Sequence, residues 1–109
     1  MIEFTKIRLN DAEIFQVLVD DDKVLVNYRN WQGKANQIVF EEVAGYQSFS
    51  VEGKALSHGT VENEDPFLSL ACEMAEEDSA SGFKVYSFVS AWNDAKILRV
   101  VAKRVKLST

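Results

Sequence analysis

The chain has 109 residues, of which 47% are hydrophobic and 27% are charged, and its formal net charge is −5. A chain of this size and composition is expected to form a single domain, residues 1–109, with a real apolar core. The negative charge argues against a general nucleic-acid-binding protein, because contact with phosphates needs a basic surface.

Three absences narrow the class of protein further. The single cysteine, Cys72, cannot form an intrachain disulfide. No segment approaches the ~20 consecutive apolar residues that a membrane helix needs. The first residues lack the basic-then-apolar order of a secretory signal, so a cleaved leader is not expected and we expect a cytoplasmic protein.

The first sixty residues are typical of β-strands. Apolar residues alternate with charged ones from residue 2 to residue 9. Two β-rich segments flank three consecutive aspartates at 20–22, which predicts a hairpin whose turn they form. Gly45 indicates a bend or bulge between two further strands. The strands expected here cover residues 13–19, 23–29, 37–43, 46–51 and 55–61.

An acidic segment, residues 62–78, contains seven acidic residues and no basic one. Asp65 can cap the first turn of a helix, and Pro66 suits its first position. Apolar residues then recur at i, i+3, i+4 and i+7, which predicts a helix over about 65–77 with one apolar stripe packed on a face of the sheet. The stripe consists of Phe67, Leu70, Ala71 and Met74.

The end of this helix violates an electrostatic rule. Glu76, Glu77 and Asp78 crowd its C-terminus, where the helix dipole disfavours each exposed anion by roughly 0.3–1 kcal/mol. A local rule that is broken without visible compensation often marks a functional surface.

The last third of the chain predicts a long hairpin. Its arms cover residues 83–92 and 96–107 and flank a turn at 93–95. Both arms are apolar on both faces, which is typical of strands at the middle of a sheet. The predicted fold is therefore α+β: a mostly antiparallel sheet of about seven strands, for which sandwich-like and barrel-like forms both remain open, with one amphipathic helix.

No catalytic or metal-binding pattern is present. Cys72 and His58 are the only thiol and imidazole, but Cys72 lies mid-helix among acids and His58 has no second ligand at a useful spacing, so both are interpreted as structural. The aspartates at 20–22 diverge too much to wrap a cation. Of the adjacent Glu41 and Glu42, one is expected to face inward. We therefore expect no enzyme activity, no metal and no cofactor.

The charges of the acidic segment and of the last strand are complementary. Residues 96–109 contain five basic residues and no acid, and the acidic segment contains the reverse. One interpretation is internal pairing, with the helix over or beside the basic last strand. The other is that part of the acidic surface stays unpaired and receives a basic partner. The two interpretations are compatible.

In size, in charge and in two segments, the chain resembles bacterial immunity proteins, which are single-domain inhibitors that neutralise a toxin, often a basic nuclease. The segments are residues 62–78 and the aromatic-rich residues 86–94. The resemblance implies a non-enzymatic protein-binding module, a monomer or homodimer, that occludes a basic partner such as a toxin domain. The expected partner-binding residues are Glu62, Glu64, Asp65, Glu73, Glu76, Glu77 and Asp78, with Trp31 as an aromatic anchor.

Two other functions remain open from the sequence. One is a small-ligand-binding domain with an aromatic-lined pocket between helix and sheet, formed by Tyr86, Phe88 and Trp92. The other is a homo-oligomeric structural subunit that associates through a strand edge.

Overall fold

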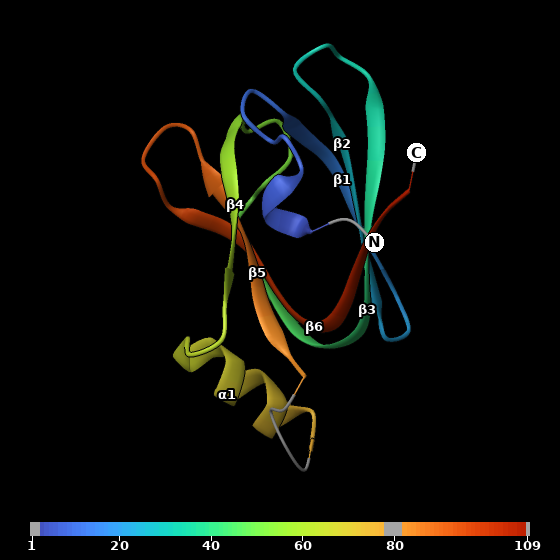
Figure 1. Cartoon of the computed structure of the whole chain (residues 1–109), viewed down its shortest axis with the longest axis vertical. Helices are drawn as coiled ribbons and strands as arrows, with labels where there is room; N and C mark the ends of the chain where they lie inside the picture. The colour runs from blue at the N-terminus through green and yellow to red at the C-terminus, as the bar shows by residue number, and fades with distance from the viewer. Residues whose placement is uncertain (1–2, 78–81, 109) are drawn as a thin grey trace.

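The computed structural model describes residues 3–77 and 82–108 of the chain (Figure 1). Within these residues, six strands form one antiparallel sheet in the order β1-β2-β3-β6-β5-β4. A single-turn 3₁₀ helix, η1, and one α-helix, α1, complete the α+β fold, as predicted. The bounds are η1 Phe4–Lys6, β1 Glu13–Asp20, β2 Lys23–Arg29, β3 Ala35–Ser48, β4 Leu56–Glu62, α1 Pro66–Met74, β5 Lys84–Ser90 and β6 Lys96–Ser108.

The two longest strands, β3 and β6, bend together and give the sheet its curvature (Figure 1). Their register shifts between Val43 and Gly45, and Glu42 adopts a left-handed conformation with φ 53°. A bulge of this kind sharpens the twist of a strand. The bend turns one half of the sheet toward the other, and the main core lies between the two halves.

Phe4 of η1 fills the centre of this core. Its ring lies 5.2 Å from that of Phe88 and 5.4 Å from that of Tyr86, both edge to face. Of the segment predicted to be strand-like, residues 2–9, residue 2 lies outside the described residues, and residues 3–9 form no strand. Phe4 is buried from the 3₁₀ turn, and Ile7 and Leu9 are buried from the irregular chain that follows it. Gly59 leaves room for the Phe4 ring, since a Cβ there would lie 2.5 Å from it.

The two edge strands approach each other at one end of the sheet. Glu13 at the start of β1 bridges to Ala55 just before β4. The Leu56 N–H donates to the Ala12 carbonyl at 2.8 Å, and the Asp11 N–H donates to the Leu56 carbonyl at 3.0 Å. The sheet is strongly curved but not closed into a barrel.

The strand count differs from the expected seven for one reason. Residues 37–43 and 46–51 were expected as two strands, but β3 continues through Gly45 and leaves six strands in the described residues. Of the last two strands, β6 is central as predicted, whereas β5 lies between β6 and the edge strand β4. Both faces of β5 are nevertheless buried.

The helix α1 covers the convex face of the sheet, opposite to the main core. Leu68, Ala71 and Cys72 pack on Val85 and Val101 in a second apolar cluster. Among the described residues, no helix has the length and apolar character needed to cross a lipid bilayer.

Candidate functional site

The first acids of the acidic segment form ion pairs with strand β6 of the sheet. The Phe67 N–H donates to the Asp65 carboxylate at 2.8 Å, so Asp65 caps α1 as predicted. The same carboxylate lies 3.4 Å from the Arg99 guanidinium and 3.9 Å from the Lys96 ammonium, and it is only 10% exposed. Glu62 forms an ion pair with Lys96. The expected pairing between the acidic segment and the basic last strand is confirmed for these two acids.

Arg99 connects this pairing to the rest of the convex face. Its guanidinium donates to Gln47 Oε1 from two nitrogens, at 2.6 and 3.0 Å, and lies over the Phe67 ring at 4.5 Å from its centroid. Partly exposed ion pairs of this kind contribute about 0.2–1 kcal/mol each. Asp65 therefore holds the start of α1 against β6, and Glu62 links the end of β4 to β6. Both carboxylates already have a cationic partner within the chain.

The other described acids of the acidic segment are exposed to solvent. Glu64, Glu73, Glu76 and Glu77 are exposed, and no ion pair among the described residues involves them. Asp78, the last predicted partner-binding acid, lies outside the described residues. Between these carboxylates lie two exposed apolar side chains of α1, Leu70 at 54% and Met74 at 77% exposure.

The predicted apolar stripe of the helix was therefore wrong for two of its four residues. Leu70 and Met74 face away from the sheet, and the buried positions are Leu68, Ala71 and Cys72, with Phe67 only partly buried. The cause is a close approach of the helix to β3, where a Cβ on Gly45 would lie 3.1 Å from the Ala71 Cβ. Small residues must face the sheet at this contact, and the larger Leu70 and Met74 are left outside.

The helix ends in a Schellman-type C-cap. The Glu77 N–H donates to the Cys72 carbonyl at 2.9 Å, and the Glu76 N–H donates to the Glu73 carbonyl at 3.1 Å. Glu76 occupies the left-handed position, φ 59°, that glycine usually takes. The last turn contains no basic residue. The chain thus places exposed carboxylates at the negative end of the helix dipole.

We call the set of exposed residues at the end of α1 the α1 outer face. It consists of Leu70, Glu73, Met74, Glu76 and Glu77. Trp31, the predicted aromatic anchor, is not part of it: the turn between β2 and β3 lies at the far end of the long axis from α1 (Figure 1). Trp31 is 48% exposed and lies against the Arg8 guanidinium at 4.3 Å.

The predicted aromatic pocket between helix and sheet does not exist in that form. Tyr86 and Phe88 belong to the main core on the opposite face from α1, and Trp92 is 88% exposed in the turn after β5. Trp92 does not share a face with Tyr86 and Phe88, because β5 ends at Ser90 and the alternation of side chains along the strand ends with it.

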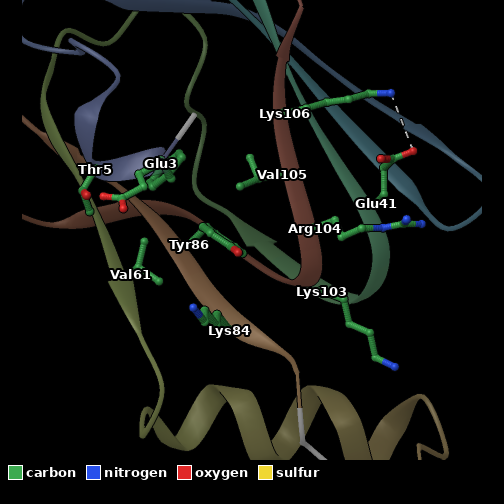
Figure 2. Close-up of a pocket in the computed structure, with 11 residues that line it drawn as sticks. Glu3, Thr5, Glu41, Val61, Lys84, Tyr86, Lys103, Arg104, Val105 and Lys106 are labelled. Carbon is green, nitrogen blue, oxygen red and sulfur yellow. Dashed lines mark ion pairs between the residues drawn. The ribbon is translucent and has the colours of Figure 1, made fainter. Parts of the chain in front are cut away.

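A different cavity opens on the concave face, between η1 and strands β3 to β6 (Figure 2). Its volume is about 580 Å³, and its apolar wall includes Phe4, Val61, Tyr86 and Val105. No pattern in the sequence indicates this cavity, because its lining residues come from several separate segments. Burial raises the pKa of the Tyr86 phenol, so the hydroxyl is a donor at neutral pH.

The other side chains that the sequence analysis considered for catalysis or metal binding have structural surroundings. Glu41 is the inward member of its pair: it lines the cavity and lies 3.8 Å from Lys106. Burial raises the pKa of the Cys72 thiol, and the negative charge of Glu77 raises it further. The positive charge of Lys103 lowers this pKa by a smaller amount. His58 is exposed and hydrogen-bonds to Ser57. No cluster of metal-ligand side chains occurs in residues 3–77 and 82–108.

Comparisons with protein-family models, with curated proteins and with solved structures found no match to this chain.

Proposed function

We propose that this protein is a non-enzymatic protein-binding module that occludes a basic partner with the α1 outer face. The observation that carries the proposal is the exposure of Leu70 and Met74 among carboxylates that form no ion pair within the described residues. Apolar side chains ringed by charge are typical of interfaces, where the apolar residues become buried and the charges stay at the rim.

The mechanism that follows is steric and electrostatic. Carboxylates of Glu73, Glu76 and Glu77 attract a basic surface and speed the encounter. Leu70 and Met74 then bury apolar area against the partner, and Met suits this role because its unbranched side chain adapts to the opposing surface. A basic nuclease fits this chemistry, since carboxylates can take the places that substrate phosphates occupy. An immunity-type inhibitor of such a toxin is the function that we propose.

The earlier acids have a different role in this proposal. Glu62 and Asp65 are already paired with Lys96 and Arg99, so their contribution is to the structure, Asp65 at the start of α1 and Glu62 between β4 and β6, rather than to contact with the partner. Glu64 is exposed at the other end of the helix and extends the negative surface there.

The test uses three tagged baits and lysate of the source organism, washed at stepped salt concentrations. The baits are the wild type, the double variant Glu76→Lys/Glu77→Lys, and a control with the same change in charge, Glu13→Lys/Glu52→Lys, whose two sites are exposed and outside α1. We expect a basic protein that the wild type and the control retain and that the α1 variant releases at much lower salt. Equal retention by all three baits would contradict the proposal.

A further inference from the structure

The cavity on the concave face carries an inference that is independent of the proposed function. At about 580 Å³ it lies in the range of roughly 300–1,000 Å³ that small-molecule sites occupy. It lies on the opposite face of the sheet from α1, so a ligand there would not compete directly for the α1 outer face.

One wall of the cavity presents a fixed hydrogen-bond donor. The Tyr86 ring is held by Phe4 and Phe40, with centroids 5.4 and 5.3 Å away. Its hydroxyl points into the cavity (Figure 2), and none of the hydrogen bonds among the described side chains involves it. A rigid aromatic ring with an available hydroxyl is a common element of ligand sites, because it orients a polar group at a low cost in conformational entropy.

The charge around the cavity is opposite to that of the whole chain. The chain has a net charge of −5, yet the cavity lining contains four cations and two carboxylates. Two of these cations have anionic neighbours: Arg104 lies 3.2 Å from Glu42, and Lys106 lies 3.8 Å from Glu41. The lining cations are Lys84, Lys103, Arg104 and Lys106.

Lys84 is the cation best placed to meet a ligand. It lies two residues before Tyr86 on β5, so the two side chains leave the strand on the same face. No ion pair among the described residues involves it. By contrast, Lys103 extends away from the cavity (Figure 2) and lies over the Phe83 ring at 5.0 Å.

We propose that this cavity binds a small organic anion with a flat apolar body. The body packs against Phe4, Val61 and Val105, and the Tyr86 hydroxyl donates a hydrogen bond to the anionic group. Lys84, which forms no ion pair among the described residues, supplies the positive charge. The carboxylate of Glu3, which lines the cavity from the η1 side, orients the anion away from η1 and toward β5 and β6.

The experiment titrates the whole protein with two fluorescent probes of similar shape. 1-Anilinonaphthalene-8-sulfonate carries the anion, and N-phenyl-1-naphthylamine lacks it. We expect saturable binding of the sulfonate at one site, tighter than binding of the neutral amine and weaker as salt rises. Equal affinity for the two probes, or no saturable binding of the sulfonate, would overturn the proposal.

Variants then identify the cation that contributes to sulfonate binding. Lys84→Gln should weaken sulfonate binding by about two- to fivefold, the effect of one partly screened charge, and leave the neutral probe unchanged. Lys34→Gln, an exposed lysine in the β2–β3 turn, is the matched control and should change neither. Tyr86→Phe should weaken sulfonate binding with little change in stability, because no described side chain forms a hydrogen bond with the hydroxyl.

A two-dimensional ¹H–¹⁵N spectrum separates this site from a non-specific one. With the sulfonate bound, we expect shifts at Thr5, Lys84, Tyr86 and Val105, all in the cavity lining. Shifts centred on Leu70 and Met74 would place the dye on the α1 outer face and would overturn the cavity proposal, while leaving the proposed protein-binding function standing.

Discussion

The carboxylate of Asp65 caps the first turn of α1 and at the same time lies 3.4 Å from the guanidinium of Arg99 on β6. One side chain therefore starts the helix and fixes it to the central strand. This double role explains why an acid that looked available for a partner is 90% shielded from solvent, since its exposure is only 10%.

Two substitutions at Asp65 separate the cap from the ion pair. Asp65→Asn keeps a good N-cap and loses the charge, so we expect a loss of less than about 1 kcal/mol in the free energy of unfolding. Asp65→Ala loses both and should cost about 1–2 kcal/mol. Urea denaturation measures both values. Equal losses for the two variants would show that the cap contributes nothing.

Gly45 is expected to be intolerant of a side chain. A Cβ there would lie 3.1 Å from the Ala71 Cβ, so Gly45→Val should push α1 off the sheet and cost about 1–3 kcal/mol. A double-mutant cycle with Gly45→Ala and Ala71→Gly should give a coupling energy that reports the contact. Strictly additive effects would mean that the two residues do not limit the approach of the helix.

Glu76→Gly should stabilise the protein. Glu76 has φ 59° at the position just after the C-cap residue Ala75, where glycine avoids a steric cost of roughly 1 kcal/mol. The change also removes an anion from the negative end of the helix dipole. Glu77→Gly is the control, because Glu77 is not among the residues with positive φ, and it should bring a smaller gain or a loss. Thermal unfolding of the two variants compares them directly.

Stability should fall at alkaline pH. Burial raises the pKa values of Tyr28, Cys72 and Tyr86 above those of the unfolded chain. Such groups hold protons more tightly when folded, so their contribution is complete below the unfolded pKa and is lost as the pH rises through the raised one. We expect the free energy of unfolding to decline above about pH 8.5, where thiols begin to ionise.

Tyr86→Phe tests the assignment of this decline. The variant removes one of the three groups, so its stability should fall less steeply between about pH 9 and 11 than that of the wild type. Tyr46→Phe, at a residue that is 45% exposed, is the control and should follow the wild type. Parallel curves for all three proteins would refute a role for the Tyr86 phenol.

Local patterns predicted most of the fold. The β-branched segments around the aspartates at 20–22 gave β1 and β2 nearly to the residue, and Asp65 with Pro66 gave the start of α1. These patterns depend only on residues that are close together in the sequence. The single strand β3 was read as two because Gly45 resembles a break in the sequence, whereas in the fold it is the place where Ala71 approaches.

The parts that were missed depend on contacts between distant segments. Leu68, Ala71 and Cys72 form a helical stripe as regular as the one that contains Leu70 and Met74, and only the contact with Gly45 selects between them. The cavity depends on Phe4, Val61, Tyr86 and Val105, which belong to four separate elements or their flanks. No periodicity within one segment reveals such a site.

The most direct test of the α1 outer face is the association rate constant with the basic protein that the wild-type bait captures. It is measured by stopped-flow at several salt concentrations for the wild type, Glu76→Lys/Glu77→Lys and Glu13→Lys/Glu52→Lys. The account predicts that the α1 variant associates about three- to tenfold more slowly at low salt, with a flatter salt dependence, while the control follows the wild type. Identical rates and salt slopes for the α1 variant and the wild type would contradict it.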